Sequence, residues 1–100
     1  MITIKAGVKA GGIQPELLLA IMVIHGIYLR NSCPCTITSL MEGVHSTNSL
    51  HYKGRAVDIR TRDVSKPLLD AMVKEIKIGL GDEYDVVLEG DHLHVEWDAT

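Results

Sequence analysis

The sequence contains no phenylalanine, one tryptophan and three tyrosines, so its hydrophobic core must be built from aliphatic side chains. Long hydrophobic runs are missing as well. The longest apolar stretch, 17–29, includes His25 and is shorter than the roughly 20 residues that a membrane-spanning helix needs. This stretch also lacks the small-residue cleavage pattern of a secretory signal, so we expect no signal peptide. At 100 residues, the chain is expected to form one domain over residues 1–100.

Basic clusters and paired cysteines are also scarce. The 10 Lys and Arg residues are scattered among 13 Asp and Glu residues, and the net charge of −3 argues against a nucleic-acid partner. The two cysteines, Cys33 and Cys35, flank Pro34. A disulfide across one intervening residue is strained, and two thiols alone cannot complete a zinc site. We therefore expect a reduced pair, which implies no oxidising compartment.

The hydrophobic pattern predicts seven elements. The expected strands are residues 2–5, 36–41, 56–60, 84–88 and 92–97, and the expected helices are residues 15–29 and 66–78. The first helix is apolar almost all round, so it is expected to be covered on several sides. Strands and helices in this order favour an α+β fold with two main helices and a small, mostly antiparallel sheet.

The most informative residues are histidines and carboxylates. His51 precedes Asp58 by seven positions, and His92 and His94 project from the same face of the last expected strand. Nitrogen and oxygen atoms are ligands that zinc prefers, and a catalytic zinc site takes three protein ligands and a water. His51, Asp58 and one of the two late histidines would meet that count. We therefore expect one Zn²⁺ per chain.

The spacing of these residues resembles a known family. The pattern Ser-x-His-x-x-Gly-x-Ala-x-Asp, followed by a carboxylate three residues before a histidine, is similar to hedgehog signalling domains. It is similar also to bacterial and phage D-alanyl-D-alanine carboxypeptidases and L-alanyl-D-glutamate endopeptidases of the same fold. The matching residues are Ser49, His51, Gly54, Ala56 and Asp58, then Asp91 and His94.

The resemblance implies a zinc peptidase that cuts peptidoglycan stem peptides, with His51, Asp58 and His94 as metal ligands. Asp91 is then the expected general base, with Glu89 as the alternative. Asp91 and His94 fall on opposite faces of an ideal strand, so Asp91 must lie in a turn or at a bulge.

The resemblance also implies roles for three further residues. His92 is expected to stabilise the oxyanion of the tetrahedral intermediate. Ser49 matches the position that binds the carboxylate of the substrate's terminal residue, although a serine in a loop can instead cap local backbone. His45 matches a histidine near the zinc of hedgehog domains, where it assists the transition state or is an ordinary loop residue.

One departure from the pattern bears on function. Many of the peptidases carry an arginine soon after the Thr-Ser of this strand, whereas Thr38 and Ser39 lead into Leu40 and Met41. The candidates to replace it are Arg55, Arg60 and Arg62. The missing arginine favours a rival hypothesis, a non-catalytic hedgehog-like zinc domain that binds a protein or cell-wall partner.

The resemblance also suggests a biological setting. We expect a phage or bacterial lytic enzyme, made in the cytosol and acting on the cell wall after release or as part of a virion. We expect it to be a monomer. The bond that is cut, and the choice between carboxypeptidase and endopeptidase, stay open.

Overall fold

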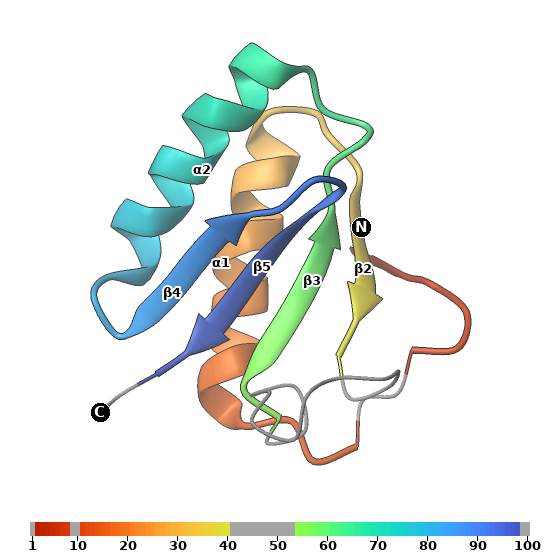
Figure 1. The fold of residues 1–100 in the computed structure, drawn as a ribbon, viewed down its shortest axis with the longest axis vertical. Coiled ribbons are helices and arrows are strands. Elements are labelled where there is room, and N and C mark those ends of the chain that lie inside the picture. The colour runs from red at the N-terminus through yellow and green to blue at the C-terminus, as the bar shows by residue number, and fades with distance from the viewer. Residues whose placement is uncertain (1, 9–10, 41–53, 99–100) are drawn as a thin grey trace.

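The computed structural model describes residues 2–8, 11–40 and 54–98 and shows one mixed sheet with two helices on one of its faces (Figure 1). The order along the chain is strand, helix, two strands, helix and two strands. The elements are β1 (Ile2–Ile4), α1 (Pro15–Arg30), β2 (Cys35–Ser39), β3 (Ala56–Arg60), α2 (Lys66–Leu80), β4 (Tyr84–Leu88) and β5 (His92–Trp97).

The sheet has the strand order β1-β2-β3-β5-β4. Only β1 and β2 are parallel, and α1 connects them, whereas the remaining neighbours are antiparallel. β4 and β5 form a hairpin, closed by a hydrogen bond from the amide of Glu89 to the carbonyl of His92 at 2.9 Å. The α+β fold class is therefore confirmed, and β1 lies at one edge of the sheet.

The helix α1 is less covered than its composition suggests. Its buried side chains, among them Leu17, Ile24 and Tyr28, pack against the sheet and α2. On its outer side Leu19 and Met22 are 60% and 67% exposed. The expectation of cover on several sides is wrong, because an apolar composition all round the helix does not say how many neighbours the fold provides. Among the described residues, neither helix has the length and hydrophobicity needed to cross a lipid bilayer.

The helix α2 follows its amphipathic pattern, with Leu69, Met72 and Ile76 buried against the sheet and α1. It ends two residues later than predicted, at Leu80, before Gly81 with φ of 84°. Ser65 occupies the N-cap position in extended conformation, but its side chain makes no capping hydrogen bond.

Alternation along β3 and β5 divides their side chains between two environments. Val57, Ile59, Leu93 and Val95 point toward the helices and are fully buried. The residues between them therefore point to the face of the sheet that carries no helix. The two strands thus place Asp58, Arg60, His92, His94 and Glu96 on one face.

Gly54 anchors the start of β3 to the segment before α1. Its φ is +70°, and its carbonyl accepts a hydrogen bond from the amide of Gln14 at 2.9 Å. A Cβ atom at Gly54 would overlap the carbonyl oxygen of Gly12. The residue is therefore required both for its backbone conformation and for the close approach of two segments.

We expect Gly54→Ala to destabilise the fold more than Gly7→Ala. Gly7 also has a positive φ (89°), but no heavy atom lies within 4 Å of the position that its Cβ would take. Gly7→Ala should cost about 1 kcal/mol for conformation alone, and Gly54→Ala about 1–3 kcal/mol more for the overlap. Urea unfolding of the two variants measures the difference. Equal losses would show that the backbone at Gly12 adjusts without cost.

Candidate functional site

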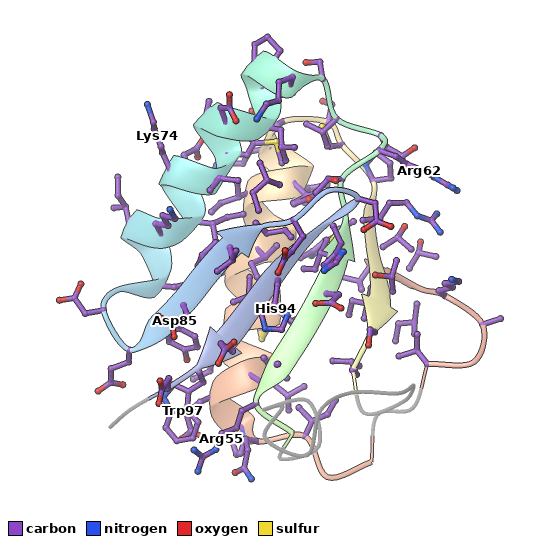
Figure 2. The ribbon with its side chains drawn as sticks, in the orientation of Figure 1. Arg55, Arg62, Lys74, Asp85, His94 and Trp97 are labelled. Carbon is purple, nitrogen blue, oxygen red and sulfur yellow. The ribbon has the colours of Figure 1, made fainter. Side chains whose placement is uncertain are left out.

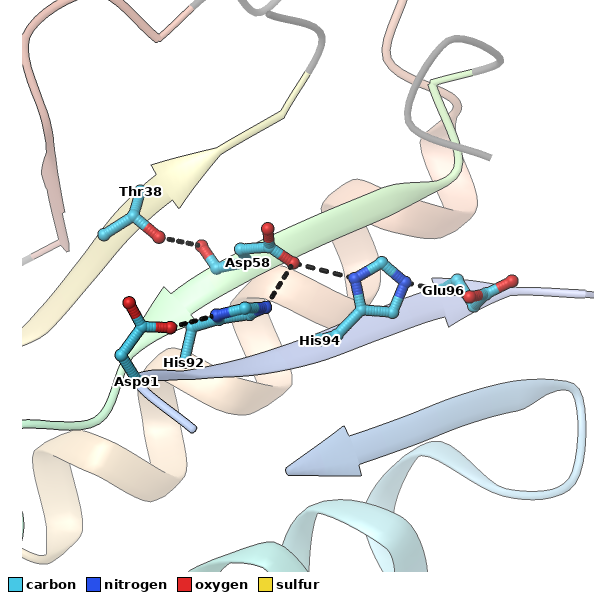
Figure 3. Close-up of polar contacts among 6 residues, drawn as sticks. All are labelled: Thr38, Asp58, Asp91, His92, His94 and Glu96. Atoms are coloured by element: carbon cyan, nitrogen blue, oxygen red, sulfur yellow. Dashed lines mark hydrogen bonds and ion pairs between the residues drawn. The ribbon is translucent and has the colours of Figure 1, made fainter. Parts of the chain in front are cut away.

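The register of β3 and β5 brings the candidate site residues together. Asp58 lies opposite His94, and Arg60 lies opposite His92, in an antiparallel pair. On the other side of β3, the hydroxyl of Thr38 donates a hydrogen bond to the carbonyl of Asp58 at 3.3 Å. Figure 3 shows the side chains of Asp58, His92 and His94 side by side on the same face. Residues that are far apart in the sequence therefore form one cluster.

Asp58 and His94 make the closest contact of this cluster. The Oδ1 atom of Asp58 lies 2.7 Å from Nδ1 of His94, and the two side chains are only 14% and 20% exposed. The hydrogen bond to Asp58 raises the pKa of His94 to about 9, against the opposing effect of burial and with help from Glu96. In this arrangement His94 is an imidazolium at neutral pH, so a metal ion that binds Nδ1 must displace a proton.

Glu96 is a site residue that the sequence analysis missed. Its Oε1 atom lies 2.8 Å from Nε2 of His94, so the imidazole is held between two carboxylates (Figure 3). A carboxylate on the second nitrogen of a metal-binding histidine fixes the ring orientation and makes the ligand more basic. The signal was present in the sequence, because Glu96 is two residues beyond His94 on the same strand face.

Asp91 and His92 form a second pair next to the first. Oδ1 of Asp91 lies 2.6 Å from Nδ1 of His92, and Nε2 of His92 lies 3.8 Å from Oδ1 of Asp58. This hydrogen bond with His92 lowers the pKa of Asp91, whose side chain is 91% exposed. Asp91 precedes β5, so it lies in the turn, as the strand geometry required. Glu89 also lies in this turn and is exposed.

The cluster contains two of the three residues that the sequence predicts as zinc ligands. Asp58 offers a carboxylate oxygen and His94 a ring nitrogen, at adjacent positions of the sheet and with little exposure. These donor types fit zinc, and Glu96 provides the outer-shell partner that a ligating histidine needs. His51, the expected third ligand, lies outside the described residues, as do Ser49 and His45. Among residues 2–8, 11–40 and 54–98, no three acidic, histidine or cysteine side chains are grouped to hold a metal.

Arg55 does not belong to this cluster. Its guanidinium lies over the ring of Trp97, 5.0 Å from the ring centroid, and its carbonyl accepts a hydrogen bond from the amide of Trp97. Figure 2 shows Arg55 and Arg62 at opposite ends of the sheet. Arg55 therefore stabilises the ends of β3 and β5, whereas Arg60 lies opposite His92. This contact leaves Arg60 and Arg62 as candidates for the missing arginine.

A small α+β sheet with a His, Asp and Glu cluster on its open face is typical of the fold shared by hedgehog domains and zinc peptidases. Residues 29–95 match the model of the hedgehog amino-terminal signalling domain. Because this match spans more than half of the 100 residues, the chain belongs to that family. The matched range includes Asp58, Asp91, His92 and His94, and it ends one residue before Glu96. A search of curated proteins found no significant match.

Proposed function

We propose that the chain is a zinc-dependent peptidase that hydrolyses peptide bonds in peptidoglycan stem peptides. One observation carries the proposal: the contact of 2.7 Å between Asp58 and His94 lies directly beside the Asp91–His92 pair. A pair of metal donors next to an exposed carboxylate is the arrangement that metal-assisted hydrolysis requires. Membership of a family related in fold to zinc peptidases supports the same reaction class.

The metal would be held by Asp58 and His94 together with His51. A zinc ion in such a site supplies Lewis-acid polarisation of the scissile carbonyl and activation of the attacking water. Glu96 keeps the Nε2 atom of His94 engaged, so that Nδ1 faces Asp58. The protein thus holds both donor atoms close together on the open face of the sheet.

Asp91 would transfer the proton. Its pKa is lowered by His92, so it is ionised at neutral pH, and its exposure lets a substrate approach it. During hydrolysis, Asp91 accepts a proton as the water oxygen bonds to the carbonyl carbon. It then delivers that proton to the amine as the C–N bond breaks. His92, when protonated on Nε2, donates a hydrogen bond to the carbonyl oxygen as negative charge develops there.

The proposed setting follows from the resemblance of the site to cell-wall peptidases. The enzyme would be a phage or bacterial lytic protein that is made in the cytosol, acts as a monomer and reaches the wall after release or within a virion. Its substrate would be the peptide stem of peptidoglycan.

The decisive experiment is digestion of purified peptidoglycan, with the released fragments identified by mass spectrometry. We expect the zinc-loaded protein to release stem-peptide fragments and a chelator to abolish the release. Zinc should restore the activity after the chelator is removed, whereas magnesium should not, because Mg²⁺ prefers six oxygen ligands. The fragment masses also identify the bond that is cut.

The same experiment tests the rival hypothesis. A protein that binds one zinc ion per chain yet releases no fragment from peptidoglycans of different stem composition would be a non-catalytic zinc-binding domain. Fragment release that survives the chelator would contradict the metal dependence. A chain without zinc affinity would contradict both hypotheses.

A further inference from the structure

The outer surface of α1 carries no acidic residue, lysine or arginine between Glu16 and Arg30. A surface helix of a globular protein normally has charged and polar side chains on the face opposite the core. On α1 that face instead has large apolar side chains that are 50% to 67% exposed, namely Leu18, Leu19, Met22 and Leu29. An exposed apolar surface of this kind marks a site of interaction with another molecule.

This apolar surface continues across a groove onto α2. The groove has a volume of about 480 Å³, and its lining includes Met22 and Gly26 from α1 and Ile78 and Gly79 from α2. Ile78 is 84% exposed. A Cβ atom at Gly26 would meet no heavy atom within 4 Å, so open space lies over this residue. The two helices lie side by side on one face of the sheet (Figure 1), and we call their outer surface, formed by Leu18, Leu19, Met22, Leu29 and Ile78, the apolar helical face.

The charge of the two helices is opposite in sign to that of the rest of the chain. α1 and α2 carry four of the 10 basic residues and three of the 13 acidic ones, a net charge of +1, which leaves −4 for the other residues. Two of these three acids are neutralised by ion pairs with Arg30 and Lys66. Lys74 and Lys77 have no ion pair within the described part of the chain, and Lys74 points outward from α2 (Figure 2). This separation of charge orients the helices toward an anionic surface.

We propose that the apolar helical face docks on an anionic lipid surface, with α1 and α2 lying in the plane of the interface. In this orientation the apolar side chains enter the boundary between headgroups and acyl chains. Lys74 and Lys77 then lie close to anionic headgroups, which attract lysine near the membrane surface. Fluid acyl chains also fill the groove between the helices, whatever its exact shape.

Charge favours lipid over a second copy of the chain. A symmetric dimer would place the apolar helical face against itself. Because this face has a surplus of positive charge, that contact brings like charges together, whereas an anionic lipid surface complements them. The inference does not depend on the proposed function. It implies that the Asp58–His94 pair faces away from the lipid, because that pair lies on the face of the sheet without helices.

Sedimentation with vesicles measures the binding. The full chain is mixed with vesicles of phosphatidylglycerol and phosphatidylethanolamine in equal parts, or with vesicles of phosphatidylcholine alone. We expect at least tenfold stronger partitioning into the anionic vesicles at low salt. The difference should shrink as salt is added, because ions screen the attraction between lysine and headgroup.

Two pairs of charge variants locate the basic contribution. Lys74→Gln/Lys77→Gln should weaken partitioning into the anionic vesicles by about 30-fold, the effect expected from two lysines near an anionic surface. Lys5→Gln/Arg62→Gln is the matched control, because it removes the same charge on the other side of the sheet, where Lys5 and Arg62 line a pocket beside His92. This control should bind as the wild-type protein does.

Two further variants locate the apolar contribution. Met22→Ser/Ile78→Ser should weaken partitioning by tenfold or more, because it removes the two most exposed apolar side chains of the face. Val87→Ser is the control, since Val87 is an exposed apolar residue that lies opposite His94 on the open face of the sheet. The substituted side chains are exposed, so thermal unfolding should change little in any variant. In vesicles with brominated acyl chains, Met22→Trp should show added fluorescence that is quenched, and Val87→Trp should not.

Four results would overturn the proposal. Failure of the wild-type protein to partition into anionic vesicles refutes it directly. Equal partitioning into phosphatidylcholine would remove the role of charge. Wild-type binding by Met22→Ser/Ile78→Ser would place the lipid contact elsewhere on the molecule. A wild-type dimer that this variant dissociates, together with no vesicle binding, would assign the face to a second copy of the chain.

Discussion

The His94→Ala protein is expected to bind zinc more than about 100-fold more weakly than the wild-type protein. The substitution removes the ring nitrogen that lies 2.7 Å from Oδ1 of Asp58 and so takes one donor from the proposed ligand set. Changes in the outer shell of a zinc site already cost about 10- to 100-fold, so loss of a ligand should cost more. Competition against a chromophoric chelator at one fixed pH measures the affinity.

Variants of Glu96 provide a comparison for the loss of zinc affinity expected in His94→Ala. Glu96→Gln keeps an oxygen that can accept a hydrogen bond from Nε2 of His94 and should weaken zinc binding little. Glu96→Ala removes the acceptor and should weaken it by about 10- to 100-fold. Glu75→Gln is the matched control, because Glu75 pairs with Arg30 on the helical side of the molecule. Full zinc stoichiometry and affinity in His94→Ala would contradict the ligand assignment.

His92→Ala distinguishes a ligand from a catalytic neighbour. Nε2 of His92 lies 3.8 Å from Oδ1 of Asp58, a longer distance than that to His94. We therefore expect zinc content to be unchanged in this variant and turnover to fall more than substrate affinity, as for an interaction made in the transition state. Equal zinc loss in His92→Ala and His94→Ala would make both histidines ligands and favour the non-catalytic zinc domain.

The parts of the site that could be predicted are those that depend on strand periodicity. The alternation of apolar residues predicts which side chains of β3 and β5 face the core. It therefore also predicts that Asp58, His92 and His94 point away from the core. The turn position of Asp91 followed from the same geometry. The pairing of Asp58 with His94, by contrast, depends on the register between two strands, which is set by the whole sheet and its turns.

Other parts required the tertiary structure. Nothing local to Lys5 indicates that it lines a pocket together with Arg60 and Arg62, because its position depends on the parallel pairing of β1 with β2. The stacking of Arg55 on Trp97 is also a contact between distant residues, and it decides which arginines face the site. The outer side of α1, where Met22 is exposed, was not predicted because composition does not reveal how many sides of a helix are covered. The predictions for His45, Ser49 and His51 fall outside the described residues.

Asp91→Asn is expected to retain zinc and to lower kcat by about 100- to 10,000-fold, the usual contribution of a general acid–base group. An asparagine has nearly the same shape, and its amide oxygen can still accept the hydrogen bond from Nδ1 of His92. The variant therefore removes proton transfer while keeping the turn and the imidazole in place. Because the proton is transferred in the chemical step, kcat and kcat/KM should fall together.

Glu89→Gln is the matched control for Asp91→Asn. Glu89 lies in the same turn, is exposed like Asp91, and loses the same charge on substitution. Its side chain makes no contact with His92 or His94 among those found within the described part of the chain. We expect Glu89→Gln to hydrolyse stem peptides at nearly the wild-type rate. If Glu89→Gln is inactive with zinc bound and Asp91→Asn is active, the base is Glu89, the alternative expected from the sequence, and the role assigned to Asp91 is wrong.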